Sequence, residues 1–223
     1  MLVWLPERHV PQTVEKPLIH PYLHGWFGHG NRRVIDHLLV TLEPNTVIEL
    51  GSWYGKSADY IINHRHSPNR LFCVDLWSEQ DILDNIQVIK PHHILRHQGE
   101  KKPVVQVIKQ HPLWETFLVN LWPHRNRVSA IKNDSLTGLR IIADYLTHLG
   151  EQDTVSLIYI DADHRYDAVC EEIQLAHKLF PNAQLVGDDY TAHRPVRRAV
   201  CDMASLLGMT VQTDHNCWYY LPQ

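Results

Sequence analysis

The chain has 223 residues, of which 44% are hydrophobic and 21% are charged, and its formal net charge is −4 at pH 7. These values are typical of a soluble globular protein, and they exclude the basic field that binding to a nucleic-acid backbone requires. No apolar run is long enough for a membrane span, and no charged leader precedes an apolar segment. The four cysteines form no CxxC pair, so we expect reduced thiols in a cytoplasmic protein.

The first segment, residues 1–30, is rich in proline and glycine, and it is predicted to form an irregular N-terminal arm. From Asn31, apolar residues recur at helical spacing until Pro44, which predicts a helix. The run Thr46–Leu50 that follows is short, apolar and closed by Gly51. It has the features of a buried parallel strand.

The rest of the chain alternates between predicted helices and strands. A helix over 55–63 leads to a strand over 71–74 that stops at Asp75, and this is a βαβ pattern. Further strands are predicted at 128–131, 155–160 and 184–186, and further helices at 136–149, 166–179 and 195–207. This alternation predicts an α/β fold, a doubly wound Rossmann-like sheet that is mostly parallel. Residues 209–213 and 217–221 predict a C-terminal antiparallel hairpin.

One stretch, at about 78–127, departs from this rhythm. It contains many histidines and has helical patterns around 82–89 and 114–121. We interpret it as an insertion above the carboxyl edge of the sheet, carried by a single domain over 31–223. The apolar residues at helical spacing within 114–121 are expected in the core or at an interface.

The loop after the first predicted parallel strand has the form of a ligand-binding turn. Glu49 ends the strand, Gly51 lets a ligand approach the backbone, and a helix begins just beyond Gly55. Asp75, at the end of the next strand, can bind both hydroxyls of a ribose. These features alone are compatible with a site for NAD or for S-adenosylmethionine. They are also compatible with a tight turn whose glycines serve packing only. The loop lacks the middle glycine of GxGxxG, which disfavours a pyrophosphate.

At this point the chain resembles the class I S-adenosylmethionine-dependent methyltransferases, and among them the metal-dependent small-molecule O-methyltransferases of the macrolide-sugar type. The matching segments are ELGSWYGKSA at 49–58, VDLW at 74–77, IKNDS at 131–135, IYIDADHRYDAV at 158–169 and GDDY at 187–190. The resemblance covers roughly residues 46–200. It implies that the cofactor S-adenosyl-L-methionine is bound by Glu49, Gly51, Ser52, Ser57, Asp75, Trp77, Asp134 and Ser135, with the last two at the adenine edge.

Three aspartates follow two neighbouring predicted strands. Asp161 ends one strand, and Asp188 and Asp189 end the next. Neighbouring parallel strands lie about 5 Å apart, so these carboxylates can converge on one ion, for which Mg²⁺, or Mn²⁺, is suited. The alternative is that they cap helices and bind water. Together with the resemblance, this pattern makes Asp161, Asp188 and Asp189 the predicted metal ligands.

His164 lies three residues after Asp161, on the loop that would face the methyl group. An imidazole can take the proton of an attacking hydroxyl near neutral pH, so His164 and Asp161 are the catalytic candidates. With 17 histidines in the chain, a surface or core role is the alternative. The other histidines show no zinc-binding spacing. Arg194, Arg197 and Arg198, which follow Asp188 and Asp189 in the sequence, have no assigned role.

The sequence thus predicts methyl transfer to a hydroxyl of a small-molecule acceptor that it does not identify. Two other functions stay open: a noncatalytic S-adenosylmethionine-binding regulator and a nicotinamide-dependent oxidoreductase. The intact aspartate and histidine motifs disfavour the regulator. The arm and the aromatic residues of the insertion suggest a homodimer.

Overall fold

The computed structural model describes residues 1–6, 10–80, 94–97 and 100–222. Its strands are Leu2–Trp4 (β1), Gln12–Thr13 (β2), Thr46–Leu50 (β3), Arg70–Asp75 (β4), Ile94–His97 (β5), Glu100–Pro103 (β6), Val128–Lys132 (β7), Val155–Ile160 (β8), Gln184–Gly187 (β9), Met209–Asp214 (β10) and Cys217–Pro222 (β11). Its helices are His29–Leu42 (α1), Lys56–Asn63 (α2), Val104–Gln110 (α4), Leu113–Leu121 (α5), Ser135–Leu149 (α6), Tyr166–Leu179 (α7) and Arg194–Leu207 (α8), with short 3₁₀ helices at Trp122–His124 (η1) and Gln152–Thr154 (η2). The helix expected around 82–89 lies outside the described residues.

Nine of the described strands form one sheet, in the order β10-β11-β9-β8-β3-β4-β7-β1-β2. Strands β9, β8, β3, β4 and β7 run parallel, and β11 joins β9 antiparallel. The order reverses between β3 and β8, and the crevice at the carboxyl ends of these strands is where open α/β sheets bind ligands. The predicted doubly wound, mostly parallel sheet and its C-terminal antiparallel hairpin are confirmed.

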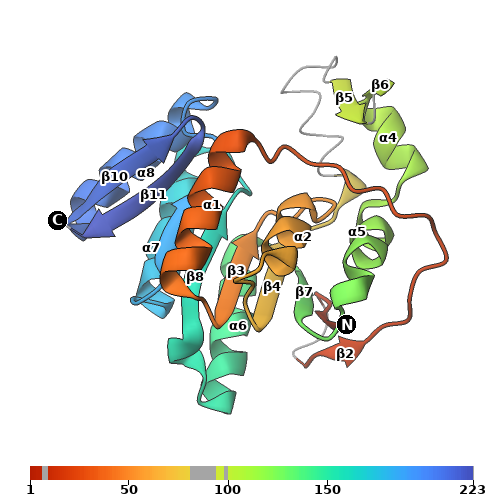
Figure 1. The fold of residues 1–223 in the computed structure, drawn as a ribbon, viewed down its shortest axis with the longest axis horizontal. Helices are drawn as coiled ribbons and strands as arrows, with labels where there is room; N and C mark the ends of the chain where they lie inside the picture. Colours follow the sequence, from red (N-terminus) through yellow and green to blue (C-terminus); the bar gives the residue numbers. More distant parts are fainter. Residues whose placement is uncertain (7–9, 81–93, 98–99, 223) are drawn as a thin grey trace.

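Helices cover both faces of the sheet (Figure 1). Apolar side chains of α1, α2, α4 and α5 pack against one face. Those of α6, α7 and α8 pack against the other. Strand β3 has five buried residues, as expected for a central strand covered on both sides. Within the described residues, no helix has the length and apolar character needed to cross a bilayer.

The N-terminal arm differs in part from the sequence-based expectation. The arm is not wholly irregular, because β1 pairs parallel with β7 and buries Val3 and Trp4. Helix α5 lies in the core, as expected for its apolar residues, with Phe117 and Leu121 fully buried. Apolar side chains of α4 belong to the same cluster, so the helical layer resumes at Val104, inside the segment that the sequence presented as an insertion.

Candidate functional site

The loop after β3 touches the loop after β8 at the point where the strand order reverses. Gly51 has a φ of 85°, and a Cβ at this position would overlap the backbone carbonyl of Asp161. The amide of Gly51 donates to the Val74 carbonyl at 2.8 Å, and the amide of Asp161 donates to the Leu50 carbonyl at 2.8 Å. Glycine is required here, because any side chain would push apart the two loops that the sequence assigned to cofactor and metal.

Glu49 is fully buried at the end of β3. The Ser52 hydroxyl donates to its Oε2 at 2.5 Å, whereas Oε1 has no hydrogen-bond partner among the described residues. Burial raises the pKa of Glu49 to about 7, against the opposing effect of hydrogen bonds from Ser52 and Ser57. Three of the predicted cofactor residues thus form one buried polar group, and its free carboxylate oxygen lacks a donor.

Asp75 organises the neighbouring loop at the end of β4. Its two carboxylate oxygens accept the backbone amides of Trp53 at 2.9 Å and Trp77 at 2.7 Å. Burial raises the pKa of Asp75, although these hydrogen bonds oppose it. Backbone amides of the loops after β3 and β4 thus hold the Asp75 carboxylate in one orientation.

Trp77, which the resemblance placed near adenine, lies beneath this loop. Its side chain is 2% exposed, and its indole Nε1 donates to the Trp53 carbonyl at 2.7 Å. Its ring contacts those of Trp114 and Phe117, with centroids 4.9 and 4.4 Å away. In this structure the Trp77 ring packs between the loop after β3 and helix α5.

Asp134 and Ser135 lie at the start of α6, beyond the carboxyl end of β7. The Asp134 carboxylate accepts the amide of Thr137 at 2.9 Å and so acts as the N-cap of the helix. Ser135 hydrogen-bonds Glu172, a buried acid of α7 whose pKa burial raises to about 7. Sequence reasoning missed Glu172, because its position in α7 shows only helical periodicity.

The three predicted metal ligands and His164 line one pocket, between the ends of β8 and β9. Burial and the charges of Asp188 and Asp189 raise the pKa of Asp161 well above its usual range. Asp188 is buried as well, and burial also raises its pKa. Burial and mutual repulsion thus oppose full ionisation of Asp161 and Asp188, and a proton or a cation would relieve that repulsion.

Two amide side chains that sequence reasoning missed hold Asp188. Asn31, from the first turn of α1, donates to Oδ2 at 2.6 Å, and Asn216, from the turn between β10 and β11, donates to Oδ1 at 2.8 Å. Neither residue lies in a motif. The one sequence signal for Asn216 was its place in the turn of the predicted C-terminal hairpin. A hairpin that extends the sheet beside the last parallel strand brings its turn close to the residues that follow that strand.

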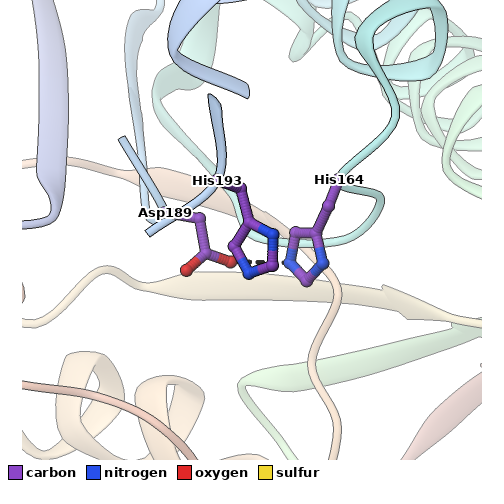
Figure 2. Close-up of side chains that lie close together, drawn as sticks. All are labelled: His164, Asp189 and His193. Carbon is purple, nitrogen blue, oxygen red and sulfur yellow. Dashed lines mark ion pairs between the residues drawn. The ribbon is translucent and has the colours of Figure 1, made fainter. Parts of the chain in front are cut away.

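His164 and Asp189 form the shortest ion pair of the pocket, with 2.6 Å between His164 Nε2 and Asp189 Oδ2 (Figure 2). Burial lowers the pKa of His164, but the hydrogen bond and charge of Asp189 outweigh it, so this pKa lies above the ordinary 6.5. The pKa of Asp189 is lowered in turn, because the bond from His164 outweighs burial. The pair is therefore stabilised in its charged form.

His193 stacks on His164, with ring centroids 4.1 Å apart and an angle of 13° between the rings. Burial and the neighbouring His164 lower the pKa of His193. Ligand atoms of His164, Asp189 and His193 lie within 4.8 Å of one another, a group of possible metal ligands that the spacing of histidines did not predict. In-plane lone pairs of parallel rings do not converge on one point, so here the group forms a stack and an ion pair.

Comparisons with known proteins agree with this architecture. The family described as a methyltransferase domain matches residues 48–190, more than half of the chain. No curated protein gives a significant match. Among solved structures, the chain is similar to cofactor-bound Rv0187 from MTB, with 16% identity over 85% of this chain and 79% of that one and a TM-score of 0.51.

Two further structures share the fold at the same level. A methyltransferase from Geobacter sulfurreducens has 15% identity over 86% of this chain and 78% of its own, with a TM-score of 0.51. A protein from Klebsiella pneumoniae assigned as an O-methyltransferase has 16% identity over 90% of this chain and 84% of its own, with a TM-score of 0.51. The matched segment, residues 48–190, contains the loop after β3 and all three aspartates. The chain therefore belongs to the methyltransferase family and has the fold of the class I S-adenosylmethionine-dependent enzymes.

Proposed function

We propose that this methyltransferase transfers a methyl group to a hydroxyl oxygen of a small molecule, with a divalent cation bound at Asp161, Asp188 and Asp189. The observation that carries the proposal is the His164–Asp189 ion pair, 2.6 Å long, in the same pocket as Asp161 and Asp188. A regulator that only binds the cofactor has no use for this arrangement. The ion pair places the proposed base, His164, next to the carboxylates of the pocket and near the loop after β3.

The residues around the loop after β3 fit S-adenosylmethionine. The cofactor supplies the electrophilic methyl group. Glu49 offers a buried carboxylate oxygen without a donor, which suits the ammonium of an amino acid. Asp75 is the proposed partner of the ribose hydroxyls, because it is a carboxylate at the end of the strand next to β3.

The three aspartates line one pocket and offer the oxygen ligands that a hard divalent cation takes, although among the described residues the possible ligand atoms within 4.8 Å of one another belong to His164, Asp189 and His193. Burial and the charges of Asp188 and Asp189 raise the pKa of Asp161, and a cation shared by the three carboxylates would offset this repulsion. Oxygen ligands of this kind favour Mg²⁺ or Mn²⁺. Such an ion would lower the pKa of an acceptor hydroxyl. Asn31 and Asn216 keep the Asp188 carboxylate in one orientation.

His164 is the proposed base, and the structure indicates which ring atom would take the proton. The Asp189 carboxylate can only accept a hydrogen bond, so Nε2 of His164 carries the hydrogen between them. The neutral ring then has its lone pair on Nδ1. We propose that Nδ1 receives the proton of the acceptor hydroxyl and that the Asp189 carboxylate stabilises the imidazolium that results.

Calorimetric titration with S-adenosylhomocysteine tests the cofactor, and transfer of radiolabelled methyl groups tests the reaction. We expect wild type to bind S-adenosylhomocysteine and Asp75→Ala to bind at least about tenfold more weakly, which corresponds to about 1.4 kcal/mol. Transfer is then screened with and without Mg²⁺ on a catechol, a sugar diol and other hydroxylated acceptors. Binding of NADH in place of S-adenosylhomocysteine would refute the assignment, and transfer that is unaffected by EDTA would remove the metal.

A further inference from the structure

The C-terminal hairpin delivers a side chain into the proposed site. Strand β11 pairs antiparallel with β9, with Trp218 opposite Gly187. The same register, continued past the ends of both strands, places Asn216 opposite Asp189. A backbone bond from the Tyr190 amide to the Asn216 carbonyl, at 2.9 Å, fixes this position.

The side chain of Asn216 uses all of its hydrogen-bonding groups. Its amide nitrogen donates to Asp188 Oδ1 at 2.8 Å and to Asp189 Oδ1 at 3.0 Å. Its oxygen accepts the backbone amides of Thr191 at 3.0 Å and Ala192 at 2.9 Å. Because those two amides can only donate, the oxygen must face them, and the nitrogen must face the carboxylates.

Trp218, two residues after Asn216, makes a second contact between the hairpin and the segment that follows β9. The Trp218 indole donates to the Asp188 carbonyl at 3.1 Å. Gly187 permits this contact, because a Cβ there would overlap the Trp218 ring and the Ile160 carbonyl. Trp218 of β11 and Asn216 of the preceding turn therefore hold the segment 188–192 by its backbone and by its two carboxylates.

We propose that Asn216 is a positioning residue for methyl transfer. It holds Asp188 and Asp189 in one mutual orientation, and through Asp189 Oδ2 it fixes the imidazole of His164. Asn216 itself contacts neither cofactor nor acceptor in this scheme. The inference rests on the proposed function for its catalytic consequence, whereas the link from Asn216 to His164 stands on the hydrogen bonds alone.

The variant Asn216→Asp separates positioning from support of the fold. It keeps an oxygen for the Thr191 and Ala192 amides but replaces the nitrogen that donates to both carboxylates. Asn216→Ala removes both sets of bonds. The matched control is Asn69→Asp, since Asn69 is exposed just before β4, at the opposite end of the sheet, and its amide donates to Asn45 Oδ1.

The decisive measurement is the imidazole ¹H–¹⁵N spectrum of protein labelled at histidine nitrogen, with His164→Gln used to identify the His164 signal. We expect the Nε2 signal of His164 to move in Asn216→Asp and Asn216→Ala and to keep its position in Asn69→Asp. Turnover with any acceptor that wild type methylates should fall roughly 10- to 100-fold in both Asn216 variants, with unchanged affinity for S-adenosylhomocysteine. A His164 signal that stays in place in Asn216→Asp would overturn the proposal.

This outcome can be separated from a failure of the proposed function. The imidazole spectrum needs neither cofactor nor acceptor, so it reports on the link from Asn216 to His164 alone. If wild type does not bind S-adenosylhomocysteine, the proposed function is rejected, whereas the test of the link from Asn216 to His164 is unaffected. An unmoved signal in a wild type that binds and turns over rejects the role of Asn216 alone.

Discussion

Glu49 should make the stability of the free protein depend on pH in an unusual direction. Its pKa rises from 4.5 to about 7 on folding, because the carboxyl is buried. Between these values the folded state retains a proton that the unfolded state has lost, so the free energy of unfolding falls as pH rises. At about 1.4 kcal/mol for each pKa unit, the loss is about 3 kcal/mol in total.

The perturbation is Glu49→Gln, which removes the ionisation at similar volume. At pH 5 the variant and wild type should have similar stability, whereas at pH 8 the variant should be more stable by up to about 3 kcal/mol. Urea unfolding at pH 5, 6, 7 and 8 measures both curves. Taking their difference removes the contributions of the many histidines. Parallel curves across this range would refute the reasoning, because they would mean that Glu49 ionises in the folded state as it does in the unfolded chain.

The same substitution tests the link to the cofactor. If the Glu49 carboxylate pairs with the ammonium, S-adenosylhomocysteine should bind wild type more tightly as pH rises toward 7, by up to about tenfold for each pH unit. Glu49→Gln should bind more weakly and lose this dependence. Glu172→Gln gives a second case for the stability prediction, because the pKa of Glu172 is also about 7, so this variant too should be more stable than wild type at pH 8.

Three further substitutions test the rest of the site. Gly51→Ala should lower the free energy of unfolding by roughly 3 kcal/mol, because its φ is positive and its Cβ meets Asp161. Gly28→Ala, where a Cβ meets nothing within 4 Å, should lower it by no more than about 1 kcal/mol in the same urea assay, the cost of a poorer N-cap for α1. Asp188→Ala should abolish methyl transfer while calorimetry shows S-adenosylhomocysteine affinity within about threefold of wild type, since a residue of the metal pocket serves the acceptor side; a parallel loss of affinity would place it in the cofactor site. Turnover of wild type should rise with pH through a value above 6.5, the ordinary pKa of histidine, because His164 must be neutral to accept a proton. His164→Gln should lower turnover by about 10²- to 10⁴-fold and lose that rise, and an unchanged pH profile would exclude His164 as the base.

The sequence predicted the sheet and its helices well where local pattern and tertiary packing agree. The buried run of β3, for example, can be assigned from Thr46–Leu50 alone, and the glycine that closes it is required by the contact with Asp161. Strand β1 was missed because its three residues sit among prolines, and only pairing with β7 makes them a strand. Helix α5 was recognised as a helix, but periodicity cannot tell whether an apolar helix covers a sheet or stands apart from it.

For the site, the sequence predicted the residues that carry formal charge and not those that orient them. Asp161, Asp188 and Asp189 do line one pocket with His164, although the metal and the catalytic roles remain predictions. Asn31 is 157 positions from Asp188 in the chain, and such a contact follows only from the packing of α1 across the sheet. His193 was similarly hidden, because its stacking on His164 depends on the turn between β9 and α8.

The order of the last strands has a kinetic consequence. The chain builds β10 at the outer edge of the sheet and then returns to place β11 between β10 and β9. A hairpin can form by itself within microseconds, so β10 and β11 can dock on β9 as one preassembled unit. We expect such docking to bury Trp218 and to bring Asn216 to the aspartates at the same time, so that the edge of the sheet and the site would be completed together.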